Sequence, residues 1–278
     1  MKITEMLELE EISLIEPMFS DLVYPDMDEF MVQRPGTSGK ILVDEDERPV
    51  IFAQKDENDG WIGCCTLLRE PSLSLIEHFE QFDCDMYQED NEIAQDAIRN
   101  YFSTILCSSV QPGPNDLNPA RVHSIESLLK KTIGTDSHQT GLDCCCGTGV
   151  GAMVMEQYGM HPLAFDNDES LLVRGMMEKR LRPERIMWID GRMISHYLTK
   201  KVSIACGFMI GEIHSFNAHI WQEIISATCL VSDNILFTTG TEPEINLIKE
   251  WVLNSGKKAE IFESDSDPIY DRWVCYSE

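Results

Sequence analysis

The sequence contains no apolar run long enough to cross a bilayer. Its longest apolar stretch, Val202–Ile213, is interrupted by glycine and falls short of the roughly 20 apolar residues that a transmembrane helix needs. The first residues, Met1–Glu5, place an acid where a secretory signal would have basic and then apolar residues. These absences predict a cytoplasmic protein without a membrane-spanning helix.

Basic side chains are also scarce. The 278 residues include 22 Lys and Arg against 48 Asp and Glu, which gives a net charge of −26. Residues 1–120 alone have 26 acids against 7 bases, and no basic stripe with interleaved aromatics appears in them. A polyanion would be repelled, so nucleic acid is disfavoured as a partner and the acidity is interpreted as a solubilising surface.

Metal-binding spacings are missing despite ten cysteines. The sequence has no Cys-x-x-Cys pair and no Cys/His cluster with zinc spacing. Cys144, Cys145 and Cys146 are consecutive, and consecutive strand residues point to opposite faces, so these thiols cannot converge on one metal. We expect reduced core thiols, no disulfides and no metal site.

A loop rich in turn formers, Gln111–Pro119, divides the chain. It predicts two domains, residues 1–115 and 116–278. The first domain is expected to begin with a helix of apolar residues between Met6 and Ile15, broken at Pro17. The rest of this α+β domain is expected to comprise an antiparallel meander of strands 40–43, 49–54 and 61–68 and helices 73–82 and 92–107.

Short apolar strands alternate with helices in the second domain, which is typical of a doubly wound, mostly parallel sheet. The expected helices are 121–132, 150–158, 169–180, a short one around Ser195, 218–230 and 244–254; the expected strands are 141–146, 162–166, 185–190, 202–209, 234–239, 258–263 and 272–276. The last two strands are joined by a turn at Asp265–Pro268.

The densest motif runs from Asp143 to Ala152, where an apolar strand enters a glycine-rich turn and then a helix. Such a turn lets backbone N–H groups and a helix N-terminus approach a nucleotide-like ligand. Gly147-x-Gly149-x-x-Ala152 also fits the dinucleotide pattern, with Asp166 about 20 residues downstream. Asp143 argues against a dinucleotide, because a carboxylate beside the turn repels the pyrophosphate. The same carboxylate attracts a sulfonium ligand that carries an amino group.

The sequence resembles the class I S-adenosylmethionine-dependent methyltransferases, whose first motif is acid-x-Gly-x-Gly-x-Gly. Asp143, Gly147 and Gly149 match this motif, and Cys145 stands where the family has its first glycine. The resemblance covers residues 121–278 and implies a seven-stranded sheet with an antiparallel last strand. It implies that the first domain is a substrate-recognition or cap region.

The resemblance also implies the cofactor-binding residues. Asp166, which closes the second strand, would hold the ribose hydroxyls. Asp190, at the end of the third strand, would meet the adenine amino group, and Ile189 or Asn167 would flank the adenine ring. The complete expected set is Asp143, Cys145, Gly147, Thr148, Gly149, Asp166, Asn167, Ile189, Asp190, Gly191 and Gly207.

Acceptor-side residues are expected after the fourth strand, because ligands bind at the carboxyl ends of such strands. Glu212 and His214 are the candidate acid/base groups there, although an ordinary polar loop with a surface carboxylate and imidazole is the favoured interpretation. The Asn-Pro-Pro-aromatic signature of enzymes that methylate nucleobase or glutamine nitrogens is absent. The sequence therefore predicts an S-adenosylmethionine-dependent methyltransferase acting on a small molecule or a protein side chain. The alternatives are a non-catalytic cofactor-binding or regulatory protein and an NAD-dependent oxidoreductase.

Overall fold

The computed structural model describes residues 1–133 and 140–277 and divides the chain into two compact units. The first unit is Met1–Ile105 and the second is Leu106–Glu278. This division falls ten residues before the boundary that the sequence predicts, because it lies inside helix α4 (Asn91–Ser109), whose Leu106 packs in the core of the second unit.

The first unit is an α+β fold around a five-stranded sheet. Its elements are α1 (Ile3–Met6), β1 (Ser13–Leu14), η1 (Phe19–Val23), α2 (Met27–Val32), β2 (Gly39–Val43), β3 (Pro49–Lys55), β4 (Trp61–Cys65), α3 (Leu73–Phe79), β5 (Cys84–Gln88) and most of α4. The strand order is β1-β4-β3-β2-β5, and β2, β3 and β4 form the antiparallel meander that the sequence predicts. The strands β1 and β5 pair in parallel at the two edges.

The helix expected between Met6 and Ile15 is wrong. Helix α1 ends at Met6, Glu8 has a positive φ of 51°, and the chain continues as the short strand β1 beside β4. Met6, Leu7 and Ile12 of this segment are buried by tertiary packing, which does not require them to lie on one helix face.

An ion-pair network lies inside the first unit. Arg69 contacts Glu16 at 3.2 Å and Asp28 at 2.5 Å, and all three side chains are at most 5% exposed. Asp28 also accepts a hydrogen bond from the Ser72 backbone at the start of α3. The network therefore ties α2, α3 and the segment after β4 together.

The second unit has the doubly wound fold that the sequence predicts. Its elements are α5 (Pro119–Thr132), β6 (Gly141–Cys144), α6 (Val150–Gln157), β7 (Leu163–Asp166), α7 (Glu169–Met177), η2 (Pro183–Arg185), β8 (Ile186–Trp188), η3 (Gly191–His196), β9 (Val202–Gly207), α8 (Ala218–Val231), β10 (Ser232–Thr239), α9 (Glu242–Asn254), β11 (Glu260–Glu263) and β12 (Trp273–Ser277). The strand order is β11-β12-β10-β9-β6-β7-β8, with β12 antiparallel to its neighbours and the other ladders parallel. This is a Rossmann-like, seven-stranded, mostly parallel sheet with one antiparallel strand.

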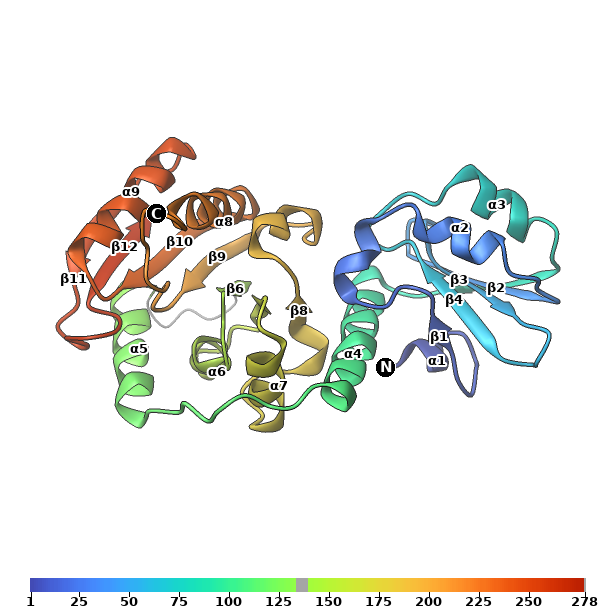
Figure 1. Ribbon diagram of the computed structural model, residues 1–278, viewed down its shortest axis with the longest axis horizontal. Helices are drawn as coiled ribbons and strands as arrows, with labels where there is room; N and C mark the ends of the chain where they lie inside the picture. The colour runs from blue at the N-terminus through green and yellow to red at the C-terminus, as the bar shows by residue number, and fades with distance from the viewer. Residues whose placement is uncertain (134–139, 278) are drawn as a thin grey trace. The chain divides into compact units, whose positions relative to one another are not determined.

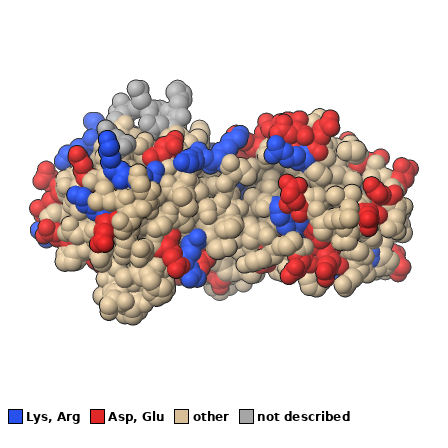
Figure 2. Space-filling model, turned by 90° about the horizontal axis from the view of Figure 1, so that it is seen from above, with Lys and Arg blue, Asp and Glu red and all other residues tan. Residues whose placement is uncertain are grey.

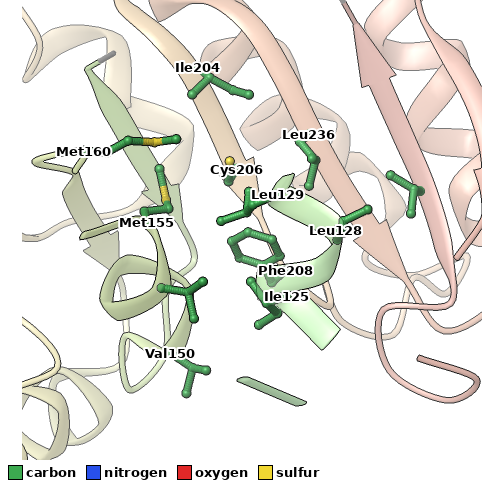
Figure 3. Packing of buried hydrophobic residues seen from close by; sticks show 12 residues of the cluster. Ile125, Leu128, Leu129, Val150, Met155, Met160, Ile204, Cys206, Phe208 and Leu236 are labelled. Atoms are coloured by element: carbon green, nitrogen blue, oxygen red, sulfur yellow. The ribbon is translucent and has the colours of Figure 1, made fainter. Parts of the chain in front are cut away.

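Helices cover both faces of this sheet, which is why its central strands β6 and β9 are mostly apolar and are buried along almost their whole length. In Figure 1, α8 and α9 lie on one face and α5, α6 and α7 on the other. Figure 3 shows Ile125 and Leu129 from α5 packed against Cys206 and Phe208 near the end of β9. This packing fixes the start of α5 close to the carboxyl ends of the central strands.

Local signals in the sequence explain where these helices begin. Asn118 caps α5 by accepting a hydrogen bond from the Ala120 backbone at 3.0 Å, and Pro119 occupies the first helical position. Asp168 caps α7 by accepting from Ser170 and Leu171. Within the described residues, no helix combines the length and the apolarity needed to cross a membrane.

Candidate functional site

Three residues with left-handed backbone alternate in the turn that joins β6 to α6. Cys145, Gly147 and Gly149 have φ values of 52°, 54° and 77°. Glycine adopts this conformation without steric cost, whereas cysteine does not. At Gly149 a Cβ atom would also lie 2.3 Å from Leu181, so this position requires glycine on both grounds. The turn is thereby held as a tight backbone loop in front of the N-terminus of α6.

Asp143 lies just before this turn with its side chain buried. Its Oδ2 accepts a hydrogen bond of 2.6 Å from the backbone N–H of Ala152, so the carboxylate caps the first turn of α6. Burial raises the pKa of Asp143 to about 7, against the lowering effects of that hydrogen bond and of nearby Arg121. The carboxylate therefore changes charge near neutral pH.

Asp166 closes β7, one strand away in the sheet. Its Oδ2 accepts from the Gly147 backbone at 2.7 Å and its Oδ1 accepts from the Asp168 backbone at 2.9 Å. Burial raises the pKa of Asp166 in spite of these bonds. Each carboxylate oxygen has a second acceptor position, so Asp166 can fix the glycine turn and still accept a hydrogen bond from a ligand.

The residues that follow β7 and β8 differ in burial and in their partners. Ile189 is buried, whereas Asn167 is exposed and accepts a hydrogen bond from the Trp188 indole through its backbone carbonyl. Asp190 caps η3 and forms a bidentate ion pair with Arg192, with contacts of 2.9 and 2.5 Å to one of its oxygens. The Arg192 hydrogen bond lowers the pKa of Asp190. Gly191 is buried beside it.

Thr148 belongs to a polar group that sequence reasoning did not find. Its hydroxyl contacts both oxygens of Asp116, at 2.7 and 2.9 Å, and lies 3.0 Å from the guanidinium of Arg180. Burial alone would raise the pKa of Asp116, but the hydrogen bonds from Thr148 and Arg180 outweigh it and leave that pKa below its usual range. Asp116 precedes α5 and Arg180 follows α7, so no local pattern relates them.

Arg121 is the second group that the sequence did not indicate. From the first turn of α5, its Nε lies 3.2 Å from Asp271 and its Nη2 donates to the Phe208 carbonyl at 3.3 Å. The Asp271 side chain also accepts from Thr238, whose hydroxyl oxygen accepts from the Met209 backbone at 2.6 Å. These bonds connect α5, β10 and the segment after β9 around one buried carboxylate.

An open pocket lies at this edge of the sheet. It is lined by Asp116, Arg121, Asp143, Cys145, Cys146, Gly147, Thr148, Val150, Gly151, Phe208 and Met209. Four of the residues predicted from the sequence, Asp143, Cys145, Gly147 and Thr148, line it directly. Gly149 and Asp166 do not line the pocket. Asp166 accepts a hydrogen bond from the Gly147 backbone, and Gly149 belongs to the same turn. Gly207, which ends β9, is packed against Ile210 and Phe237.

The two candidate acid/base residues lie outside this pocket lining. Glu212 and His214 occupy the loop after β9, where their side chains are 87% and 53% exposed and 3.5 Å apart. The loop is closed by Asn217, which accepts from the His214 backbone and donates to the Glu212 carbonyl. The structure thus places neither residue against the glycine turn.

The cysteines of the site are free thiols. Burial, together with the charges of nearby Asp166 and Asp143, raises the pKa of Cys145, so this thiol stays protonated. All ten cysteines are unbridged. Over the part of the chain that the structure describes, no group of three or more His, Cys, Asp or Glu side chains is arranged to hold a metal ion.

Comparisons of sequence find no match for this chain, whereas comparisons of structure find similar solved structures. No family model matches this chain, and no curated protein matches it. Among solved structures, magnesium protoporphyrin IX methyltransferase from Synechocystis PCC 6803 with bound SAM is similar over 66% of this chain and 96% of its own, with 12% identity and a TM-score of 0.47.

Two further structures have other acceptors in their names. A 16S rRNA methyltransferase from T. thermophilus in complex with AdoMet and guanosine matches 60% of this chain and 44% of its own, at 13% identity and a TM-score of 0.44. A sugar N-methyltransferase from Streptoalloteichus matches 61% of this chain and 96% of its own, at 8% identity and a TM-score of 0.44. The structures similar to this chain thus include methyltransferases for porphyrin, RNA and sugar, and they do not support the expectation that nucleic acid is disfavoured.

Proposed function

We propose that this chain is a class I methyltransferase that binds S-adenosylmethionine in the pocket at the end of β6. One observation supports this most strongly. A turn with three alternating left-handed residues lies between the carboxylates of Asp143, the last but one residue of β6, and Asp166, the last residue of the neighbouring strand β7. Asp143 has the position that the family motif requires, and Asp166 closes the next strand as the second motif requires.

The charge of the pocket fits this ligand. Asp143 and Asp116 both line it, but Asp116 is already paired with Arg180. The ionised Asp143 carboxylate would repel a pyrophosphate and attract a ligand with a sulfonium and an ammonium group. Arg121 is the single basic residue among the lining residues named above, and it offers a partner for a carboxylate.

Each end of the ligand then has a group of this chain to recognise it. The Asp143 carboxylate would accept from the ammonium group, and the Arg121 guanidinium would bind the carboxylate. Asp166 would accept from the ribose hydroxyls while it keeps its bond to Gly147. Ile189 would pack against the adenine ring, and Asp190 would have to leave its ion pair with Arg192 to reach the adenine amino group.

In the reaction, the bound cofactor supplies a methyl group, to which the acceptor lone pair bonds while the electron pair of the C–S bond returns to sulfur. The chain's own part is to align the two reactants and keep water out, which lowers the barrier without a strong base. Glu212 and His214, exposed on the loop after β9, would take up a proton that the acceptor releases. We propose that residues 1–115 help recognise the acceptor, a small molecule or a protein side chain.

Replacing Asp166 tests the cofactor site. Asp166→Ala should weaken the binding of S-adenosylhomocysteine by about 1–3 kcal/mol, because the ribose hydroxyls and the Gly147 N–H lose their acceptor. The measurement is calorimetric titration of the full chain. The control is Asp233→Ala, an exposed acid at the opposite end of β10. Unchanged affinity in a folded Asp166→Ala protein would contradict this role.

A further inference from the structure

A second pocket of the second unit lies at the amino ends of β7 and β8, and its lining shares no residue with that of the cofactor pocket. It is formed by α6, by the segments that lead into the two strands and by the loop after α7. Its charged lining residues are Glu156, Arg180, Arg182 and Arg185. Three arginines against one carboxylate make this pocket basic in a chain whose net charge is −26.

The turn that ends α7 places Arg180 in the protein interior. Lys179 has a φ of 58°, and the backbone N–H groups of Arg180 and Leu181 both donate to the Gly175 carbonyl, at 2.9 and 3.2 Å. A left-handed residue followed by such bonds ends a helix with its last carbonyls satisfied. The Arg180 side chain that follows this turn is only 2% exposed. Its position is therefore fixed by the backbone and by burial.

Only one nitrogen of the Arg180 guanidinium is bonded. Nη1 donates to Asp116 at 3.1 Å and to Thr148 at 3.0 Å. Nε and Nη2 are buried and have no hydrogen-bond partner within the part of the chain that the structure describes. A buried charged donor without a partner is destabilising, and such donors commonly mark the place of a bound ion or water.

The two unpartnered nitrogens of Arg180 form one edge of the guanidinium. Their N–H groups are parallel, and this edge matches two oxygens of a carboxylate or phosphate group. Arg182 is half exposed and pairs with Glu156, so an incoming anion would compete with that carboxylate for it. The free space in the pocket is small, enough for about one water-sized group. An oxyanion would therefore enter with its oxygens while the rest of it stays at the open mouth.

We propose that this pocket binds a small oxyanion, a phosphate or a carboxylate group, on the Nε–Nη2 edge of Arg180. Arg182 and Arg185 would supply further positive charge around it. Nη1 keeps its bonds to Asp116 and Thr148, so the anion site and the cofactor pocket are joined through one side chain without sharing a ligand. The proposal does not depend on the identity of the cofactor.

Calorimetric titration of the full chain with inorganic phosphate, and separately with acetate, tests the site. Ionic strength is held constant with chloride, so that general screening does not change. We expect the preferred anion to bind with a dissociation constant of about 1 mM or lower, and the preference identifies the group as phosphate or carboxylate. No binding of either anion up to roughly 20 mM would overturn the proposal. The titrations are repeated with saturating S-adenosylhomocysteine, whose own binding tests the proposed function separately.

Matched substitutions show whether the anion binds in this pocket. Arg182→Gln should weaken binding of the preferred anion at least about threefold, and Glu156→Gln should strengthen it about threefold, because a competing carboxylate is removed. The controls are Arg272→Gln and Glu263→Gln, which make the same changes of charge in an exposed pair elsewhere in the unit. They should change the affinity less than about twofold. Equal effects of the two pairs would overturn the assignment.

Replacement of the buried arginine tests the edge itself. Arg180→Lys keeps the positive charge and removes the two parallel donors. It should weaken binding of the preferred anion at least about tenfold. Unchanged affinity in a folded Arg180→Lys protein would overturn the proposal. If this variant does not fold, the Arg182 and Glu156 variants decide the question, because both side chains are partly exposed.

Discussion

Cys145 occupies a backbone conformation that favours glycine, at the position where the family motif has glycine. A β-branched side chain is disfavoured there more strongly than a cysteine. Cys145→Val should lower the free energy of unfolding by about 1–2 kcal/mol, whereas Cys145→Gly should stay within about 1 kcal/mol of the parent, because relief of strain offsets the entropy of glycine. Urea denaturation measures both. Equal stability of the Val and Gly variants would show that the turn is not strained at this residue.

The raised pKa of Asp143 predicts a pH-dependent affinity. Because the carboxylate ionises as the pH rises through about 7, a ligand with an ammonium group should bind about fivefold more tightly at pH 7.5 than at pH 6. S-adenosylhomocysteine has that group and methylthioadenosine lacks it, so only the first should respond. Asp143→Asn, which can still accept from Ala152, should abolish the difference. A parallel response of both ligands would place the titration elsewhere.

The same group affects stability in the opposite direction. The pKa of Asp143 in the folded chain lies above its ordinary value of 3.8, so the folded state keeps a proton that the unfolded state has lost. Its contribution to the free energy of unfolding therefore falls as the pH rises from about 4 to about 7 and is constant above that. The ionised form of Asp143, which would bind the ammonium group, thus lowers the stability of the folded chain.

The carboxylates of the site could be predicted from the sequence, but several of their partners could not. Asp143 and Asp166 each follow an apolar strand, and that local pattern is visible. Arg121 and Asp271 are far apart in the chain and meet only because α5 and β12 pack at the same edge of the sheet. Asp190 was predicted as an adenine ligand, and its bidentate pair with Arg192 depends on the fold of η3.

The elements around Asp271 depend on one another. Asp271→Ala would leave Arg121 and Thr238 without their shared partner, so we expect a loss of about 2–4 kcal/mol in the free energy of unfolding, below the figure for a fully buried pair because Arg121 is partly exposed. Arg272→Ala, which breaks an exposed pair with Glu263, is the comparison and should cost about 0–1 kcal/mol. Chemical denaturation distinguishes them, and equal losses would contradict a role for the network in joining β9, β10 and α5.

Helices and strands with a clear periodicity of apolar residues could be predicted in the second unit, and most of these predictions differ from the structure only at the ends of the elements. The strand predicted over 202–209, for example, ends at Gly207 because Met209 turns into left-handed backbone. The first unit was harder. Strand β5 was missed because it is an edge strand whose residues are mostly exposed and polar, and the expected helix over Met6–Ile15 was wrong because tertiary burial produced its apolar spacing.

The whole molecule is strongly acidic, and Figure 2 shows Asp and Glu side chains spread over the face in view, with Lys and Arg among them. The net charge of −26 was the ground for disfavouring nucleic acid. The net charge of a protein is a weak guide to the ligand of one site, because binding in a pocket depends on the few charged groups that line it.

Calorimetric titration of the full chain with S-adenosylhomocysteine, with NAD in parallel, tests the central claim most directly. The proposed function predicts binding of S-adenosylhomocysteine in the micromolar range and none of NAD, because the ionised Asp143 carboxylate repels a pyrophosphate. Binding of NAD alone, or of neither ligand, would contradict it.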